Sequence, residues 1–277
     1  MRCCGPGLGF LPASLVILSF GTFCTTYIIA IYRGDVSVLF PYISDTGTSR
    51  PESCIFGQFL NICAGLAFCT IYVRYKLVQG FNGSEGRRLK CMNKTCLFFG
   101  VLVSLGLSMV ANFQETSVET VHIIGAAMVF GVGVLYEVIQ TMLTYHMYPE
   151  YNGLYICRVR LTICILSFAS MIISILFLSG STIISRSVAK PQDKLHWKPD
   201  EAGYIPHIVS TAGEWATAVS FLLFFFTFIR DLQKVSLDIN TRIHVRHLDE
   251  HPIYITDEEP VQIHSANGPD ENTKLLS

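Results

Sequence analysis

Six stretches of almost uninterrupted apolar residues follow one another along the chain, separated by shorter polar segments. They cover about residues 10–32, 53–73, 95–113, 121–143, 161–184 and 205–229. Each approaches or exceeds the roughly 20 residues that an α-helix needs to cross the hydrocarbon core of a bilayer. The pattern predicts an all-α integral membrane protein built as a compact bundle of six transmembrane helices, within a membrane domain of residues 1–237.

The fourth and sixth stretches are the least uniform, because each carries a histidine and a glutamate among its apolar residues. A helical hairpin in an aqueous cavity is the alternative for these two segments. Both are otherwise apolar along their full length, which favours six spans. Small residues recur at every fourth position of the second stretch, and this spacing lets helix backbones approach closely in lipid.

The distribution of charge supports this class and sets an orientation. Only 15% of the residues are charged, compared with about a quarter in soluble domains. Residues 74–94 carry six Lys and Arg, and an amino terminus in the cytosol places 14 of the 20 on the cytosolic side. We therefore expect both termini in the cytosol and residues 33–52 in the lumen. No basic cluster with interleaved aromatic residues suggests a nucleic-acid partner.

The composition changes after about residue 237. Residues 238–277 are rich in acidic residues and poor in aromatic ones, which predicts a disordered cytosolic tail. Glu271, Leu275 and Leu276 fit the acidic dileucine pattern that clathrin adaptors recognise. Cys3 and Cys4 lie just before the first span, where cysteines are frequent sites of S-palmitoylation.

The sixth span holds a stripe of polar residues. His207, Ser210, Glu214 and Thr217 are spaced so that they share one helical face. A glutamate deep in a membrane is costly unless it is paired, protonated or in contact with water. We expect Glu214 to point into the bundle, either as part of a functional site or as a hydrogen-bonding hub. Glu137 lies nearer the cytosolic end of the fourth span and is expected to snorkel toward the headgroups.

A second polar group is expected at the luminal side. His122 and His207 begin their spans there, and the facing loops carry acidic residues: Asp45, Glu52, Glu115 and Glu119. If the carboxylates prevail, histidine protonation in an acidic lumen tightens the loop at residues 41–48. If the helix dipole and desolvation prevail, the histidines stay neutral. The spacing of His and Cys predicts no metal site or other cofactor, and no known catalytic motif is present.

Pro41–Thr48 is the stretch on which a family resemblance depends. It resembles the luminal hallmark of the damage-regulated autophagy modulator family, and further motifs match that family in order along the chain. These are Ala64–Lys76, Val110–Gln114, His122, Gly125, Lys194–Trp197, Pro199, Gly203–Tyr204, His207, Glu214–Trp215 and Phe228–Lys234. Glu137 departs from the apolar residue expected in the family.

The resemblance implies a six-span protein of lysosomal and endosomal membranes that promotes autophagy, without established catalytic activity. Two classes of function remain open. In one, the protein is a regulator that recruits autophagy-related partners through its cytosolic loops and tail. In the other, it handles membrane lipids or an ion at a polar site formed by Glu214, His207 and the luminal loop. Distant members of the wider group take part in lipid remodelling or distribution.

Overall fold

The computed structural model describes residues 7–81, 86–186 and 193–236. Within these ranges the secondary structure is entirely helical. The long helices are α1 (Phe10–Arg33), α2 (Glu52–Phe81), α3 (Arg87–Asn112), α6 (Leu154–Arg186) and α7 (Tyr204–Phe226). The fourth span runs from Glu119 to His146 as α4 (Glu119–Ala126), a π-helix η2 (Ala127–Val132) and α5 (Gly133–His146). Two short pieces, the 3₁₀ helix η1 (Asp45–Gly47) and α8 (Ile229–Leu232), complete the described fold.

Six helical segments of the described chain are long and apolar enough to cross a membrane. This confirms the prediction of an all-α, six-span membrane protein. The fourth and sixth segments are also of spanning length, so the alternative of a hairpin in an aqueous cavity is wrong. The predicted tail (238–277), its dileucine residues, Cys3, Cys4 and the sequon at Asn82 lie outside the described residues.

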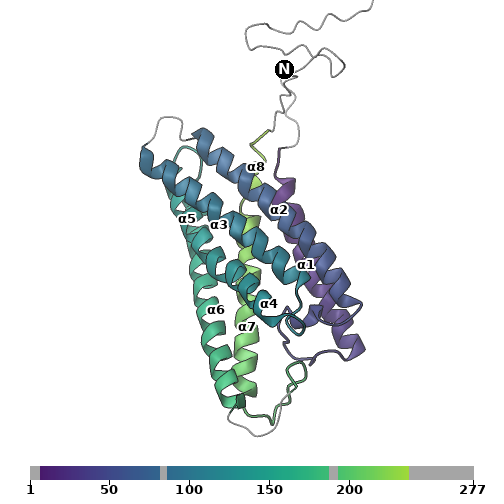
Figure 1. Cartoon of the computed structure of the whole chain (residues 1–277). Coiled ribbons are helices and arrows are strands. Elements are labelled where there is room, and N and C mark those ends of the chain that lie inside the picture. The colour runs from purple at the N-terminus through teal and green to yellow at the C-terminus, as the bar shows by residue number, and fades with distance from the viewer. Residues whose placement is uncertain (1–6, 82–85, 187–192, 237–277) are drawn as a thin grey trace, which may run out of the picture. The chain divides into compact units, whose positions relative to one another are not determined.

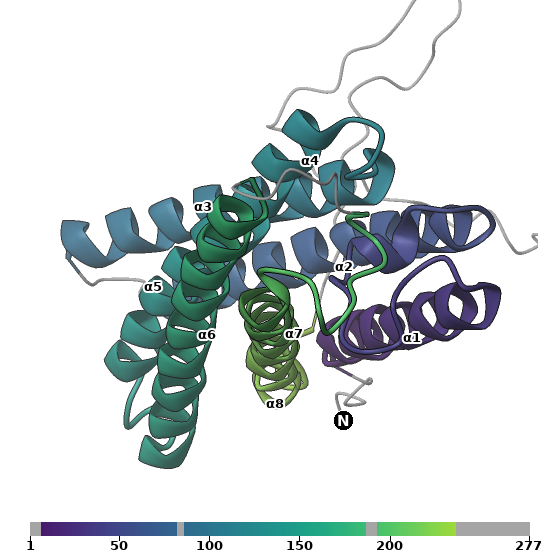
Figure 2. The ribbon, with the colours of Figure 1, turned by 90° about the horizontal axis from the view of Figure 1, so that it is seen from below.

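The helices pack as a bundle in which α2 lies between α1 and α3, and α6 runs along α7 (Figure 1). Seen along the bundle, α7 also approaches α1, while α3 contacts α4, η2 and α5 (Figure 2). Apolar side chains from α1, α2, α3, α5 and α7 form the core. On α6 many large apolar side chains are instead exposed, which is the arrangement expected where lipid rather than water surrounds a helix.

The bundle has two ends, named here for the segments that they contain. The loop end contains residues 34–51, 113–118 and 193–203, and the tail end contains residues 147–153 and 227–236. At the tail end the backbone N–H of Leu8 donates to the carbonyl of Val235 at 3.2 Å, so the first and last described segments lie side by side.

Candidate functional site

The Pro41–Thr48 loop is held against the helices at the loop end by side chains from α1 and α7. The hydroxyl of Tyr42 donates to Ser210 Oγ at 2.8 Å, and Trp215 Nε1 donates to the Pro41 carbonyl at 2.9 Å. Deeper in the loop, the hydroxyls of Thr46 and Thr26 are hydrogen-bonded at 3.0 Å. The loop is therefore an ordered plug seated between two transmembrane helices.

Gly47 is needed in this loop for a reason other than backbone freedom. Its φ is not positive, so no left-handed backbone conformation requires glycine here. A Cβ at this position would lie 2.5 Å from Cγ of Phe56 on α2. Only glycine lets η1 approach α2 so closely.

Aromatic rings close the same site from a second loop. Trp197 stacks on His207 with ring centroids 4.4 Å apart, and Tyr42 meets the same imidazole edge-on at 5.2 Å. His207, near the start of α7, is only 5% exposed. The segments 41–48 and 193–203 thus meet over one end of α7, and His207 is packed between their rings.

The carboxylates at the loop end fall into separate groups. Ser44 donates to Glu115 at 2.8 Å, and Asp45 is buried beside them. Burial, followed by the negative charge of Glu115, raises the pKa of Asp45 well above its usual range. The other two predicted acids lie elsewhere: Glu119 pairs with Lys194 at 2.9 Å, and Glu52 lies 3.9 Å from Arg33.

The two predicted histidines reach the loop end without joining these acids. His122 Nδ1 donates to the carbonyl of Phe113 at 2.7 Å, since a carbonyl oxygen can only accept. Within the described part of the chain, the only histidine paired with a carboxylate is His196, whose Nδ1 lies 2.9 Å from Asp193. Its other ring nitrogen lies 2.9 Å from the carbonyl of Gly34. Sequence reasoning did not single out His196.

Glu214 lies one turn from Ser210 on the predicted polar face of α7. Ser210 donates to the Ser174 carbonyl at 2.8 Å and Thr217 is bonded to Ser170 at 2.9 Å, so this face meets α6. Glu214 itself is half-buried. Its Oε2 is buried and has no hydrogen-bond partner among the described residues. The stripe therefore contains one polar atom that the fold itself does not satisfy.

Two cavities meet at Glu214. An outer pocket of about 270 Å³ lies between α4, η2, α6 and α7, and an inner cavity of about 110 Å³ lies in the middle of the bundle. Both are lined by Ser44, His122, Ala126, Phe130 and Glu214. The inner cavity is otherwise lined almost entirely by apolar side chains. In the described parts of the chain, no group of three or more His, Cys, Asp and Glu could hold a metal ion.

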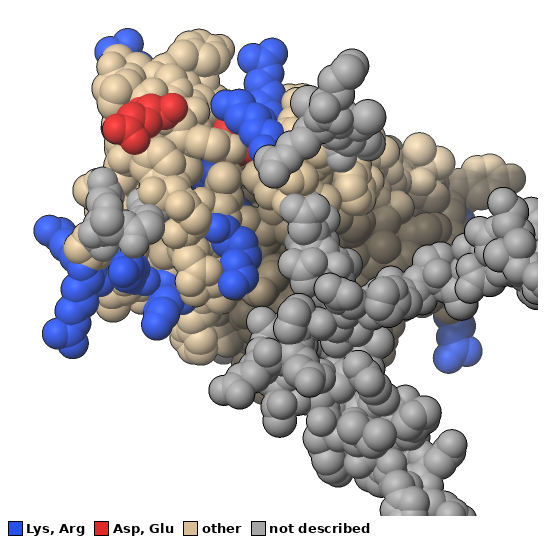
Figure 3. All heavy atoms as spheres, turned by 90° about the horizontal axis from the view of Figure 1, so that it is seen from above, with Lys and Arg blue, Asp and Glu red and all other residues tan. Residues whose placement is uncertain are grey.

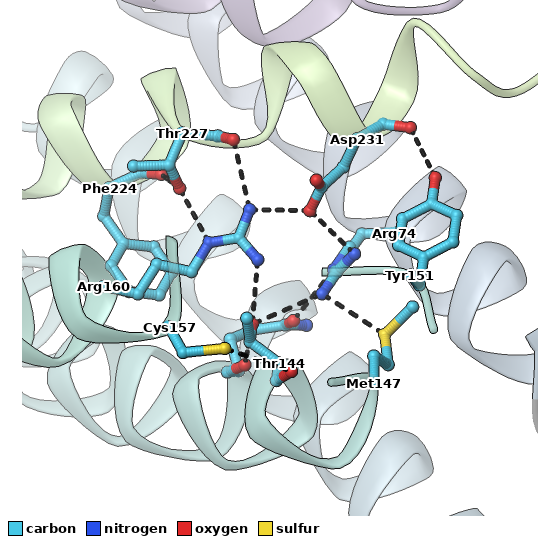
Figure 4. A network of polar contacts seen from close by, with 10 residues as sticks. Arg74, Thr144, Met147, Tyr151, Cys157, Arg160, Phe224, Thr227 and Asp231 are labelled. Carbon is cyan, nitrogen blue, oxygen red and sulfur yellow. Dashed lines mark hydrogen bonds and ion pairs between the residues drawn. The ribbon is translucent and has the colours of Figure 1, made fainter. Parts of the chain in front are cut away.

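A second polar site, which sequence reasoning missed, lies inside the tail end (Figure 4). Arg74 of α2 and Arg160 of α6 both donate to Oδ2 of Asp231 of α8, at 3.1 and 2.6 Å. Both arginine side chains are completely buried. Their remaining donors reach acceptors that include Gln140 at 3.2 Å and Thr144 at 2.8 Å on α5.

The charges in this network do not cancel, since two guanidinium groups share one carboxylate. The ring of Phe228 lies 5.2 Å from Cζ of Arg74 and 4.7 Å from Cζ of Arg160, a geometry that favours cations. The carbonyl of Thr227, just beyond α7, accepts from Arg160 at 3.1 Å, where the helix dipole also favours positive charge. The sequence offered one signal for this network: Asp231, a single acidic residue directly after the sixth span.

Glu137 of α5 contradicts its prediction. It is only 1% exposed and does not reach the headgroups. Neither of its oxygens has a hydrogen-bond partner among the described residues. The side chain is enclosed within the bundle.

Comparison with known proteins identifies the family. A family profile described as the Frag1/DRAM/Sfk1/Cwh43P N-terminal domain matches residues 7–235. The DNA damage-regulated autophagy modulator protein 2 of Bos taurus is 45% identical over 242 residues, which are 86% of this chain and 89% of that protein. The human protein of the same name is 41% identical over 271 residues, or 98% of this chain and 97% of that protein.

Human DNA damage-regulated autophagy modulator protein 1 is 39% identical over 243 residues, covering 88% of this chain and 98% of that protein. No solved structure matches the chain. The resemblance drawn from the sequence motifs is confirmed. This chain belongs to the DNA damage-regulated autophagy modulator family, within the wider Frag1/DRAM/Sfk1/Cwh43 group.

Proposed function

We propose that the protein regulates autophagy from lysosomal and endosomal membranes, and that it does so without catalysis of its own. The observation that carries this proposal is the extent of the family match, which covers all six spans. The relatives of highest identity described above are named as autophagy modulators. At the two ends of the bundle, Tyr42, Arg74 and Arg160 are engaged in internal hydrogen bonds, which suits a structural or partner-binding role.

We also propose that the tail end faces the cytosol. Viewed from that end, the surface shows many Lys and Arg side chains and little acidic surface (Figure 3). Its exposed basic residues are Lys76, Arg87, Arg88, Lys90, Lys94, Arg158, Arg230 and Lys234. Cytosolic loops carry such an excess. Glycan attached to Asn82 or Asn93 in cells would contradict this orientation, because glycosylation takes place in the lumen.

The functional test is rescue of autophagic flux in cells that lack the protein. Flux is measured as the turnover of lipidated LC3 with and without a lysosomal inhibitor. We expect the wild-type protein to restore flux and Glu214→Gln to restore it equally, if partner binding is the whole function. A matched control is Glu137→Gln, another enclosed carboxylate of the bundle that lines neither cavity. Failure of the wild-type protein to restore flux would overturn the proposal.

A second candidate function, handling of a lipid or an ion, is favoured by one observation. Glu214 lines a pocket, and its Oε2 has no hydrogen-bond partner in the described part of the chain. Loss of flux rescue by Glu214→Gln, with normal folding and targeting and with rescue retained in Glu137→Gln, would support this candidate over the first.

Three further parts of the proposal concern sorting, lipidation and protein partners, and the residues of the first two lie outside the described structure. The dileucine residues Leu275 and Leu276, with Glu271, would bind a clathrin adaptor and direct the protein to lysosomes. Cys3 and Cys4 would carry palmitate, which acyl exchange on a Cys3→Ser, Cys4→Ser double variant would test. Autophagy-related partners would bind the cytosolic surface, and labelling of neighbouring proteins in cells would identify them.

A further inference from the structure

The outer pocket opens sideways, toward the lipid. Its rim includes Ile123 of α4 and Ile175 and Leu178 of α6, which are 56%, 51% and 45% exposed. These side chains belong to membrane-spanning helices, so their exposed surface faces acyl chains. A molecule dissolved in the bilayer can therefore enter between α4 and α6 without crossing water.

The polar part of the pocket lies on the side of the Pro41–Thr48 loop and is acidic. Glu214 and Glu115 line it together with the hydroxyls of Tyr42 and Ser44. Glu115 and Asp45 are close enough to Glu214 to repel its negative charge. The basic side chain nearest this group in the described chain, Lys194, is already paired with Glu119 at 2.9 Å. Oε2 of Glu214 is left without a donor among the described residues.

The helix wall beside Glu214 is built irregularly. Ala127 and Phe130 of the π-helix η2 line the pocket, and Phe130 separates it from the inner cavity. Short π-helices interrupt the hydrogen-bond ladder of an α-helix and are found frequently at functional sites. The π-helix is a feature of the backbone and does not depend on the charges in the pocket.

We propose that this pocket binds a long-chain amine, a single-chain membrane amphiphile with a primary ammonium group. The ammonium group donates to Glu214 Oε2 and lies within the field of Glu115. The alkyl chain leaves through the rim formed by Ile123, Ile175 and Leu178. A pocket of about 270 Å³ is near the lower end of the range for small-molecule sites, so it holds the head and the first part of the chain.

The chemistry of the lining selects this class over other occupants. An anionic head, such as that of a fatty acid, would be repelled by two carboxylates. A neutral head would bring no charge complementary to either carboxylate. A bare metal ion is disfavoured, because the described residues offer no group of three ligands. A cationic head on an apolar chain satisfies both the acidic lining and the lipid-facing mouth.

The binding is tested on the purified full-length protein in nanodiscs of neutral phosphatidylcholine. The chain has two tryptophans, Trp197 and Trp215, and both lie at the loop end beside the site. Their intrinsic fluorescence therefore reports binding. The probe is hexadecylamine, compared with hexadecanol and palmitate, which have the same chain length and a neutral or anionic head. We expect a saturable change with the amine alone.

Glu214→Gln is expected to weaken binding of hexadecylamine about tenfold or more, since a charge-assisted hydrogen bond is lost. Glu137→Gln, which changes a carboxylate outside both cavities, is expected to bind as the wild type does. Ala127→Phe, which fills the pocket and keeps the carboxylate, is expected to weaken binding as well. This variant keeps the test decisive if Glu214→Gln does not fold.

Three results would overturn the proposal. One is equal binding of amine, alcohol and carboxylate, which indicates partition into lipid. Another is unchanged affinity in both Glu214→Gln and Ala127→Phe. The third is displacement of the amine by sodium but not by choline at constant ionic strength, which indicates a site for a small cation. Because binding is measured on purified protein, its outcome is independent of the proposed role in autophagy.

Discussion

Phe56 occupies the space that a side chain at residue 47 would need. The loop end is specified by a few side chains of fixed size and hydrogen-bonding capacity, and this contact is one example. Gly47 lies against Phe56, Trp215 donates to Pro41, and Thr46 is hydrogen-bonded to Thr26. Each of these partners comes from another part of the chain. The loop is therefore held by single contacts that single substitutions can test.

Gly47→Ala is expected to lower the free energy of unfolding by about 1–3 kcal/mol, the usual cost of forcing extra volume into a packed site. The added Cβ would lie 2.5 Å from Cγ of Phe56. The measurement is denaturation of the purified protein in detergent. Gly65→Ala on α2 is the control, because a Cβ there meets nothing within 4 Å. Equal stability of Gly47→Ala and the wild type would contradict the contact.

Only part of the candidate site could be predicted from the sequence. The shared face of Ser210, Glu214 and Thr217 follows from helical spacing, and the structure brings this face against α6. Glu137 was mispredicted because its position near the cytosolic end of the span does not show that neighbouring helices cover it. The unpartnered state of Glu214 Oε2 depends on which side chains surround it, and spacing along one helix does not contain that information.

At the scale of elements, the bundle is tied together at its tail end by one buried carboxylate. Asp231 receives hydrogen bonds from residues 157 and 71 positions earlier in the chain, Arg74 and Arg160. It thereby joins α8 to α2 and α6. Sequence reasoning counted both arginines as evidence for a cytosolic loop, a role that Lys and Arg near span ends usually have. Nothing in their spacing indicates that they share a partner.

Asp231→Asn is expected to destabilise the protein by about 3–5 kcal/mol, since it leaves two buried guanidinium groups without a counter-charge. Unfolding is followed by titration with a denaturing detergent. Lys194→Gln, which breaks an exposed ion pair, is the comparison and should cost no more than about 1 kcal/mol. A loss of similar size in both variants would show that the buried network contributes little.

The segments 34–38 and 193–197 form a second connection between elements, and His196 makes it pH-dependent. The pKa of His196 is raised because the Gly34 carbonyl, and then the Asp193 carboxylate, accept from its ring. A raised native pKa means that the contribution to stability is fully present below about pH 6.5, the ordinary histidine value. It is lost as the pH rises through the native value.

We therefore expect these two segments to be better protected from hydrogen exchange at pH 5.5 than at pH 8, after correction for intrinsic rates. His196→Gln should remove the difference, while His146→Gln, at the other end of the molecule, should retain it. An equal difference in the His196 variant would assign the pH response to other groups. His122 and His207, the histidines singled out by the sequence, have no carboxylate partner within ion-pair distance among the residues that the structure describes.

Across the whole molecule, the six spans and residues 238–277 carry different kinds of information: the spans specify the fold, and the last residues are expected to specify the location. The six spans could be predicted because a bilayer requires long apolar helices, and this requirement is written in residue type alone. The order in which the spans pack could not, since contacts such as Trp215 with Pro41 join positions that lie far apart in sequence. The sorting signal of the protein is expected in residues 238–277, which lie outside the described residues.

A Leu275→Ala, Leu276→Ala double variant is expected to accumulate at the cell surface, because adaptor recognition of the acidic dileucine pattern would be lost. Surface biotinylation of the variant and the wild type measures the effect. Leu248→Ala, a change elsewhere in the same segment, is the control. Unchanged surface abundance in the double variant would show that another signal directs the protein.

The π-helix η2 has a consequence for the spacing of the residues on either side of it. A π turn contains one more residue than the α turn it replaces. Loss of a single residue between Ala127 and Val132 would restore a regular helix and rotate all of α5 by about 100° relative to α4. Gln140 would then turn away from Arg74, which it now contacts at 3.2 Å. We therefore expect this stretch to tolerate replacement more readily than deletion, because its length, more than its composition, sets how the pocket at one end lies relative to the charge network at the other.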